Sequence, residues 1–475
     1  MSSHKFYTVR ETVESRFYEL QIGWHVAVKN LEHTSEFRVL TAILNLKFPF
    51  ELKDDQRLAV DAWLNNNFKG SIIYSTGTGK TEIAFECARR LAEINDNNNV
   101  ALSPKSESYN KPNQDFRILF LVPRIVLIEQ NVNRLINYGL SRESIGTFFG
   151  EQKDIREITI GTYQSVINHL DLIRDSDMLI LDEIHLLSET AKEFSKIFDT
   201  IKEDPTKAIL GLTATINEND PRYDTIIRTL PPVKKYMIRD AVSDGRLAKP
   251  HVVSIPVSFT ESEKKIYIET TNKISFLSRK LGAFDPKKIS IFLFKGGYNA
   301  KLAKLWFENV RKRKELLSSA QNKMLSAANI VKNHPSEPIM IFSETIDSIM
   351  KLETTLESCG IASRSIHNKI PVTQRKKILE DWGKEYFPLL SVHTLEIGYD
   401  IPDVRIAIII SNSSNFNQVA QRIGRVIRKT SKKNYALIYV IYIRDSKDSS
   451  TLKMVKSTID FSDKNSQLKL TSFGT

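Results

Sequence analysis

Residues 70–91 are compatible with very few folds. The apolar run Gly70-Ser-Ile-Ile-Tyr74 leads into a glycine-rich turn, Ser75–Thr81, and the turn leads into 82–91, where apolar residues have helical spacing. Strand, turn and helix in this order form a phosphate-binding loop, because backbone N–H groups at the start of a helix attract an anion. The segment therefore predicts a nucleotide-binding turn between a strand and a helix.

The residue types within this turn have defined tasks. Tyr74 occupies the position where such loops usually begin with glycine. Gly77 and Gly79 allow backbone N–H groups to turn toward phosphates. Lys80 is expected to reach the β- and γ-phosphates, and Thr81 to offer its hydroxyl to Mg²⁺. The expected nucleotide-binding residues of the turn are Ser75, Thr76, Gly77, Thr78, Gly79, Lys80 and Thr81.

Two acids, Asp182 and Glu183, follow a second apolar run at 179–181. A buried strand that ends there would place both carboxylates at the carboxyl edge of a sheet, where doubly wound folds bind ligands. Asp182 is expected to hold Mg²⁺ together with Thr81. Glu183 is placed to orient and deprotonate the attacking water. Together with Lys80, these acids predict hydrolysis of ATP, with Mg²⁺ as the cofactor.

Apolar strand-like runs occur in two series, one before residue 232 and one from Pro338 to Tyr442. Continuous apolar strands separated by amphipathic helices predict parallel sheets covered on both faces. The predicted fold class is α/β, with two doubly wound parallel-sheet domains in tandem. The expected parts are an N-terminal segment packed on the first domain (1–50), the first, ATP-binding domain (51–232), a basic helical region (233–335), the second domain (336–450) and a C-terminal tail (451–475).

The basic helical region holds most of the net charge. Thr260–Pro335 contains 16 Lys and Arg residues against 6 Asp and Glu residues, which is +10 of the chain's +12. A solvated helical face would explain this charge, and so would contact with a polyanion such as nucleic acid. Its longest helix candidates are Ser262–Lys280 and Ala300–Lys332. In the first domain, the polar residues 95–115 are expected to form a surface loop.

Composition limits the cellular setting. No apolar run approaches the roughly 20 residues needed to cross a bilayer, so no membrane partner is expected. The N-terminus has no apolar region of the kind found in secretory signals. Cys87 and Cys359 lie far apart and lack metal-ligand spacing, which indicates a reducing compartment. We expect the chain to be cytoplasmic and associated with the nucleoid, or nuclear in a eukaryote.

The acidic motif resembles a known family. Asp182-Glu-Ile-His185 is a variant of the DExH box of superfamily 2 helicases, and further family motifs occur in the expected order: Gln56, Leu121-Val-Pro-Arg124 with Gln130, Gly161-Thr-Tyr163 and Thr213-Ala-Thr215. The resemblance implies that Gln56 reads the adenine base. It also implies that Pro123, Arg124 and Thr162 touch the nucleic-acid backbone. His185, Thr213 and Thr215 are then expected to couple hydrolysis to domain movement.

Motifs of the second domain fit the same family. They are Phe342-Ser-Glu344, Thr394-Leu-Glu-Ile-Gly-Tyr-Asp400 and Gln421-Arg-Ile-Gly-Arg-Val-Ile-Arg428. Arg425 and Arg428 are the expected arginine fingers, which reach the γ-phosphate from across the cleft between the domains. The resemblance also implies nucleotide contacts by Gly398 and Asp400, nucleic-acid contact by Thr394 and a coupling role for Gln421.

Within superfamily 2 the chain is most similar to the XPB-type DNA helicases, over residues 50–445. The resemblance implies two RecA-like domains with a thumb-like insertion between them that grips DNA. The expected contacts of the insertion are Arg311, Lys312, Arg313 and Lys314. Glu218-Asn-Asp220 stands where the family commonly has Arg-Glu-Asp, an element linked to duplex opening. Movement along a duplex without unwinding therefore stays open.

These motifs favour an ATP-dependent DNA helicase or translocase. The family resemblance alone implies 3′→5′ polarity and a place in DNA repair or transcription-linked processing. The partner of such an enzyme would be double- or single-stranded DNA, with a nuclease or a repair or transcription complex as a further candidate. Two alternatives remain. An RNA helicase or a defence-system motor would carry the same ATP motifs. A non-catalytic nucleic-acid clamp would need a broken motor, whereas Lys80, Asp182 and the finger arginines are all present.

Overall fold

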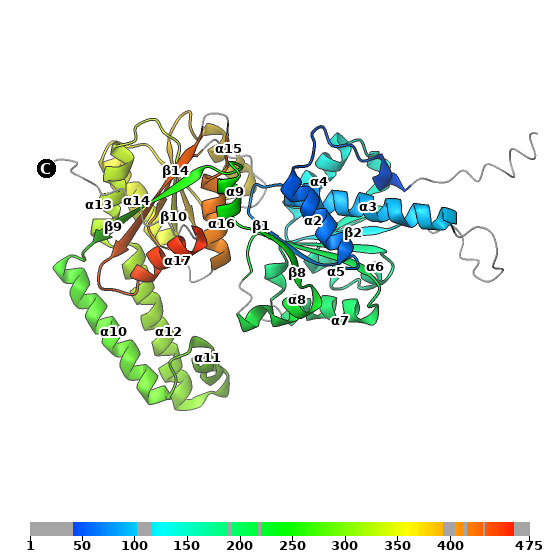
Figure 1. The fold of residues 1–475 in the computed structure, drawn as a ribbon. Helices are drawn as coiled ribbons and strands as arrows, with labels where there is room; N and C mark the ends of the chain where they lie inside the picture. Colours follow the sequence, from blue (N-terminus) through cyan, green and yellow to red (C-terminus); the bar gives the residue numbers. More distant parts are fainter. Residues whose placement is uncertain are drawn as a thin grey trace, which may run out of the picture.

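The computed structural model describes residues 41–101, 116–188, 192–216, 220–392, 404–411, 416–430 and 433–459. The described chain forms two α/β lobes side by side and a group of helices that extends away from them (Figure 1). We call the described residues of 41–236 the first lobe. The second lobe comprises 249–257 with 321–459, and the helical projection comprises 261–318.

The first lobe is built on an eight-stranded sheet of order β4-β3-β5-β2-β6-β7-β1-β8. Its strands are β1 Lys69–Tyr74, β2 Ile118–Val122, β3 Ile145–Phe149, β4 Gln152–Lys153, β5 Ile158–Thr162, β6 Met178–Asp182, β7 Ala208–Thr213 and β8 Pro232–Tyr236. Only the hairpin β3–β4 is antiparallel in this sheet. Because β6, β7 and β1 are neighbours, the residues that follow their carboxyl ends lie at one edge of the sheet.

Helices cover both faces of this sheet, as its buried apolar strands require. They are α2 Asp54–Asn65, α3 Lys80–Ala101, α4 Ile125–Asn137, α5 Tyr163–Val166, α6 Asp171–Arg174, α7 Ser195–Glu203 and α8 Asp224–Thr229. Trp63, Phe85 and Leu135 bury the face under α2, α3 and α4. Phe198 and Ile226 belong to the separate core on the opposite face. The sheet is thus the middle layer of three.

The structure bears on two expectations for the first lobe, the N-terminal segment and the loop at 95–115. Of the N-terminal segment, residues 41–50 are described, and Ile43 and Leu46 are buried in the core of this lobe. The expected loop at 95–115 starts too early, because α3 continues to Ala101. Polarity does not end a helix when no glycine or proline intervenes. Residues 102–115 lie outside the described residues.

The second lobe has a six-stranded sheet of order β11-β12-β10-β13-β14-β9, and all its pairings are parallel. Its strands are β9 Lys249–Val257, β10 Ile339–Ser343, β11 Arg364–Ile366, β12 Pro388–Val392, β13 Ile406–Ile409 and β14 Tyr435–Ile443. Its helices are α13 Gln321–Lys332, α14 Ile346–Ser358, α15 Val372–Asp381, α16 Phe416–Val426 and α17 Ser449–Ile459. The short helix α9 Ile238–Ser243 lies between β8 and β9.

The structure assigns to the second lobe three segments that were expected elsewhere, wholly or in part. Strand β9, inside the expected helical region, pairs with β14 along nine residues and so belongs to the second sheet. Helix α13 also belongs to the second lobe, because Met324 and Ala327 are buried against its strands. The expected tail begins within α17, whose Val455 and Ile459 are buried. In each case apolar burial against the second sheet decides the assignment.

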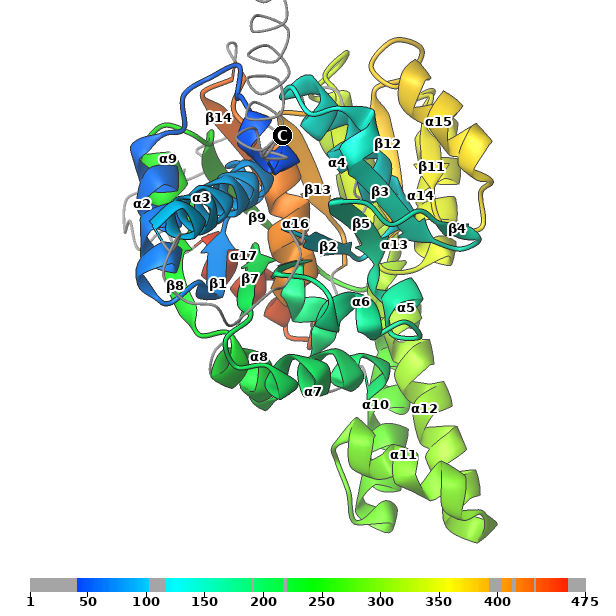
Figure 2. The same ribbon diagram turned by 90° about the vertical axis from the view of Figure 1, so that its right-hand side faces the viewer.

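The helical projection consists of α10 Glu261–Leu281, α11 Pro286–Lys295 and α12 Gly297–Ser318. It has a small core of its own, in which Leu277, Ile289 and Trp306 are buried. The single helix expected over Ala300–Lys332 is in fact two, α12 and α13, separated at Ser319 and Ala320. Figure 2 shows the projection extending well beyond both lobes. Among the described helices, none is both long and apolar enough to cross a membrane.

Candidate active site

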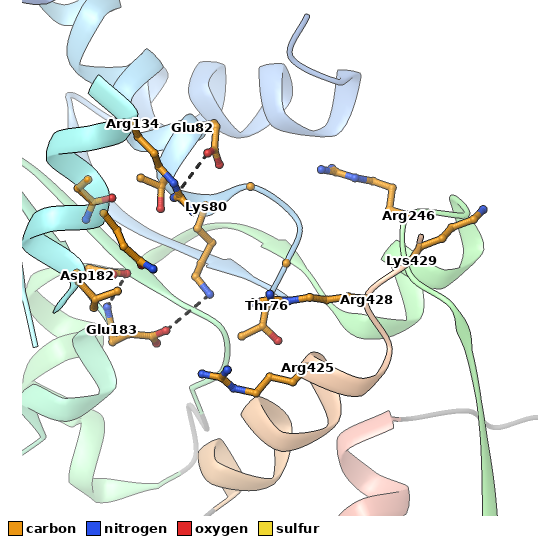
Figure 3. Close-up of a pocket in the computed structure, with 16 residues that line it drawn as sticks. Thr76, Lys80, Glu82, Arg134, Asp182, Glu183, Arg246, Arg425, Arg428 and Lys429 are labelled. Atoms are coloured by element: carbon orange, nitrogen blue, oxygen red, sulfur yellow. Dashed lines mark hydrogen bonds and ion pairs between the residues drawn. The ribbon is translucent and has the colours of Figure 1, made fainter. Parts of the chain in front are cut away.

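A cavity of about 640 Å³ lies between the two lobes (Figure 3). Its first-lobe lining comes from the glycine-rich turn, α3, α4 and the end of β6, and its second-lobe lining from α16 and the residues after it. The lining residues are Thr76, Gly77, Gly79, Lys80, Thr81, Glu82, Leu127, Gln130, Asn131, Arg134, Asp182, Glu183, Arg246, Arg425, Arg428 and Lys429. The structure therefore brings residues from sequence positions 76–82 and 425–429 to one site.

The turn has the backbone conformation that its glycines predict. Gly77 and Gly79 have φ angles of +82° and +92°, which favour glycine. Ser75 and Thr78 are buried, and their hydroxyls donate to carbonyl oxygens of Tyr236 and Ser75 at 3.3 and 2.6 Å. These two side chains therefore fix the turn, whereas Thr76, Lys80 and Thr81 line the cavity.

Gln56 lies behind the turn. Its Nε2 donates to the carbonyl oxygens of Thr78 and Gly79 at 3.2 and 3.4 Å, and its Oε1 accepts from the backbone N–H of Lys53 at 3.0 Å. A Cβ atom on Gly79 would lie 2.3 Å from Gln56 Nε2. The glutamine thus ties α2 to the turn in this structure, and its side chain is buried.

Asp182 ends β6, and Glu183 follows it beside Lys80. Lys80 Nζ lies 3.9 Å from Glu183 Oε1, and Glu183 has a left-handed φ of +53°, a strained conformation that is common at functional sites. Burial raises the pKa of Asp182 to about 7, and the Glu183 carboxylate adds to the rise. Burial acts in the same direction on Glu183, but Lys80 and His185 outweigh it and lower the pKa of Glu183 to about 2. Glu183 is therefore ionised before Asp182, because it has the closer cation.

A buried polar chain leads from Glu183 to the end of β7. His185 Nδ1 lies 3.3 Å from Glu183 Oε2 and 3.1 Å from Thr213 Oγ1. The Thr213 hydroxyl donates to the carbonyl oxygen of Thr215 at 2.9 Å. The three expected coupling residues of the first lobe are thus in series. Gln421, the fourth, is half-buried on α16 and is not among the residues that line the cavity.

The second lobe contributes arginines to the cavity. A Cβ atom on Gly424 would lie 1.6 Å from Thr76 Oγ1, so α16 approaches the turn as closely as a glycine permits. Arg428 lies alongside the turn, because a Cβ atom on Gly77 would be 3.2 Å from its Cγ. Burial lowers the pKa of Arg425 to about 10, with repulsion from Arg428 and Arg124 in addition. Arg425 remains charged at neutral pH, and a polyphosphate placed here would relieve that repulsion.

The motifs left several lining residues unidentified. Leu127, Asn131 and Arg134 project from one face of α4, with the helical spacing of four and three residues. Arg134 Nη1 lies 3.6 Å from Glu82 Oε1. The helical spacing after β2 was a signal that could have revealed them. For Arg246, on the segment that joins the lobes, no local signal exists in the sequence.

Of the first-lobe residues expected to touch nucleic acid, Pro123 and Arg124 follow β2, and Thr162 ends β5. Arg124 is exposed at the start of α4, and Pro123 beside it is half-buried. Thr162 is buried, and its Oγ1 caps α5 by accepting from the backbone N–H of Ser165 at 3.3 Å. The Thr162 side chain therefore has a structural use in the first lobe. Thr394, Gly398 and Asp400 lie outside the described residues.

The basic patch 311–314 lies at the end of α12 nearest the second lobe. Arg311 and Lys312 are exposed, and Arg311 Nε lies 3.6 Å from Glu315 Oε1. Burial lowers the pKa of Arg313. Lys314 Nζ is 3.2 Å from the buried carboxylate of Glu344. Arg313 and Lys314 are thus partly committed to contacts within the protein.

Comparison with known proteins agrees with this architecture. The family described as "Type III restriction enzyme, res subunit" matches residues 49–218, and "Helicase conserved C-terminal domain" matches residues 320–430. A "DNA 3'-5' helicase XPB" of Mycobacterium tuberculosis is 24% identical over 84% of this chain and 62% of its own length. A "DNA 3'-5' translocase XPB2" of Sulfurisphaera tokodaii is 26% identical over 85% of this chain and 84% of its own length. The chain thus spans less than two thirds of the first relative.

A solved structure shares the fold. The "ATP-dependent Type ISP restriction-modification enzyme LlaBIII bound to DNA" has a TM-score of 0.56 at 18% identity and covers 87% of this chain and 30% of its own. Two α/β lobes that share one cavity, the first matched by the res-subunit family and the second by the helicase C-terminal domain, have the architecture of superfamily 2 helicases with tandem RecA-like domains. Within that superfamily, the chain is similar to proteins named as XPB-type DNA helicases and translocases, at 24–26% identity.

Proposed function

We propose that this chain is an ATP-dependent, Mg²⁺-requiring DNA helicase or translocase that moves 3′→5′ in DNA repair or transcription-linked processing. The observation that carries the proposal is the shared cavity. Lys80, Asp182 and Glu183 enter it from the first lobe, and Arg425 and Arg428 enter it from the second. A nucleotide there would bridge the lobes, so that hydrolysis changes how strongly they attract each other.

Each of these side chains has a task in the proposed reaction. Lys80 binds the β- and γ-phosphates, and it also holds Glu183 ionised. Glu183, oriented by His185, accepts the proton of the attacking water. Arg425 and Arg428 stabilise the charge that develops on the transferred phosphoryl group, a contribution worth about 10³- to 10⁵-fold in rate in related chemistry.

The cavity also offers a fitting environment for Mg²⁺. Asp182 supplies a half-buried carboxylate and Thr81 a hydroxyl, and both line the cavity. Hard oxygen donors of this kind, few in number, suit Mg²⁺, which takes its other ligands from water and substrate phosphates. When bound, the ion would neutralise phosphate charge. Asp182 would then be held ionised despite the burial that raises its pKa.

Support for DNA as the substrate comes from the named relatives and from the charge of the chain. The relatives of M. tuberculosis and S. tokodaii are named as DNA 3′-5′ helicase and translocase. The helical projection lies beyond both lobes, where a duplex has room to approach (Figure 2). We propose that the projection is the thumb-like element that grips DNA. The chain would then act at the nucleoid or in the nucleus, with a nuclease or a repair or transcription complex as a candidate partner.

The test begins with the phosphate-binding lysine. In Lys80→Ala, DNA-stimulated ATP hydrolysis should fall by at least 100-fold, because no other cation in the turn can reach the phosphates. Lys69→Ala is the matched control, since Lys69 begins β1 at the opposite end of that strand. Hydrolysis that survives in Lys80→Ala at the wild-type rate would refute the site.

Two displacement assays then identify the motor. Strand displacement from a tailed duplex reports unwinding, and displacement of a triplex-forming strand reports movement along a duplex without unwinding. We expect ATP-dependent displacement in at least one of the two assays, with movement in the 3′ to 5′ direction. Stimulation of hydrolysis by RNA but not by DNA would favour the RNA helicase, and neither stimulation nor displacement would favour the clamp.

A further inference from the structure

Arg246 connects the two lobes beside the cavity that it lines. Its Nη1 donates to the Asp55 carboxylate, and its Nη2 donates to the carbonyl oxygen of Thr78 in the phosphate-binding turn. The guanidinium lies 5.6 Å from the ring centroid of Tyr236. Its side chain is 10% exposed, and that of Asp55 is 16% exposed. The Arg246 side chain thus makes these three contacts with the first lobe.

The backbone around Arg246 is attached to the end of α16 instead. The N–H of Ala248 donates to the carbonyl oxygen of Ile427 at 2.8 Å, and Lys429 Nζ donates to the carbonyl oxygen of Gly245 at 2.8 Å. Leu247 forms an antiparallel bridge with Arg428. The residue beside Arg246 is therefore the bridging partner of an expected arginine finger.

The first-lobe partners of Arg246 are themselves held in place. The Tyr74 hydroxyl donates to the Asp55 carboxylate at 2.9 Å, and its ring stacks on Tyr236 with centroids 4.8 Å apart. Tyr74 ends β1, directly before the turn. Asp55 precedes Gln56, which is bonded to the turn. The arginine therefore grips a fixed part of the nucleotide site.

We propose that Arg246 is a positioning residue that sets the finger Arg428 against the phosphate-binding turn. This inference rests on the proposed ATP hydrolysis. In Figure 3, Arg246 and Arg428 come from neighbouring segments and reach the turn region from the same side. The guanidinium holds the turn and the adjacent backbone holds Arg428, so the two lobes have one preferred position relative to each other. Loss of the grip lets the finger drift, and displacements of about 1 Å from a reacting group can cost about 100-fold in rate.

The kinetic signature separates positioning from substrate contact. For Arg246→Ala we expect kcat to fall about 10- to 100-fold, while the Kd of a fluorescent ADP analogue changes less than about threefold. A residue that contacts the base would instead weaken ADP binding in parallel. Asp55→Asn removes the charge partner with little change of shape, so it should lower kcat in the same direction even if Arg246→Ala folds poorly. Arg174→Ala, which removes another Arg–carboxylate pair of the first lobe, is the matched control.

A double-mutant cycle tests whether Arg246 acts through the finger. In an Arg428→Lys background, Arg246→Ala should lower kcat by less than threefold, because a misplaced finger cannot be misplaced again. If the double variant lost kcat by the product of the two single losses, the inference would be overturned. A wild-type kcat in Arg246→Ala, or a loss of ADP affinity that matches the loss of rate, would also overturn it. A wild-type protein without DNA-stimulated hydrolysis would instead refute the proposed function, so the two failures are distinguishable.

Discussion

Gly424 lies where the second lobe packs closely against the phosphate-binding turn. The space that its Cβ would occupy is filled by Thr76, with Oγ1 at 1.6 Å and Cβ at 2.9 Å. Thr76 belongs to the turn and Gly424 to α16. Neither backbone can move apart from the other without moving a lobe. A helix interior ordinarily disfavours glycine by about 1 kcal/mol relative to alanine. Close approach between the lobes therefore explains a glycine here.

Gly424→Ala should separate stability from activity. The substitution favours α16 by up to about 1 kcal/mol, so the melting temperature should stay the same or rise. It also holds Arg425 and Arg428 away from the turn, so kcat for DNA-stimulated hydrolysis should fall at least tenfold. Thr76→Ala in the same chain removes Oγ1 but keeps Cβ, and should restore part of the rate. Wild-type kcat in Gly424→Ala would show that the lobes do not need this contact.

At this scale, the sequence predicted the residues whose position follows from strand order. Lys80 follows β1, Asp182 ends β6 and Glu183 follows it. Buried strands of a parallel sheet bring such residues to one edge. Arg246 was not predicted, because its place depends on how a linker crosses between the lobes. Arg134 was missed although the helical spacing of α4 was a signal for it. Charge alone also did not distinguish Lys323, which is buried and pairs with Asp448, from exposed lysines.

Among the elements, the helical projection exposes several large aromatic side chains. Phe294, Phe284 and Tyr298 are 90%, 70% and 66% exposed at its far end. The short helix α11 carries Phe294 and also the exposed lysines Lys287 and Lys288. Aromatic rings beside lysines suit nucleic acid, since bases stack on rings and phosphates pair with ammonium groups. The basic patch 311–314 lies at the opposite end of α12 from this tip.

The paired substitution Phe284→Ala/Phe294→Ala should weaken binding to single-stranded DNA. Base–aromatic stacking is worth about 1–3 kcal/mol for each base, so a loss of at least fivefold in affinity is expected, with an unchanged salt dependence. Lys287→Glu/Lys288→Glu should reduce the salt dependence as well. Val372→Ala, at an exposed apolar position of α15, is the control. Fluorescence anisotropy with a labelled oligonucleotide measures all three, and unaltered affinity in the phenylalanine pair would exclude the tip from binding.

Element positions were predictable to different degrees for physical reasons. Strands such as β2 and β13 are continuous apolar runs, and their sequence defines them. Strand β9 was missed because it carries Pro250 and Pro256 and is only half-buried. Proline is tolerated in β9 because this strand lies at the edge of the sheet. The break between α12 and α13 carries no glycine or proline, so packing of α13 on the second lobe fixes it.

For the whole molecule, the decisive feature is that neither lobe holds a complete site. The first lobe supplies the turn and the acids, and the second supplies Arg425 and Arg428. Contacts through Gly424 and Arg246 place these halves against each other. Hydrolysis in the cavity can therefore be linked to lobe movement, and movement to the projection, which is joined to the second lobe through β9 and α13.

The most direct test is steady-state ATP hydrolysis by Arg425→Ala in saturating DNA, with ATP affinity measured on the same preparation. The side chain comes from the second lobe, so its loss leaves the phosphate-binding turn and both acids intact. The account predicts a fall in kcat of about 10³- to 10⁵-fold, with nucleotide affinity within a few-fold of the wild type. Hydrolysis at the wild-type rate would mean that the first lobe is catalytically complete by itself, and would contradict a site shared between the lobes.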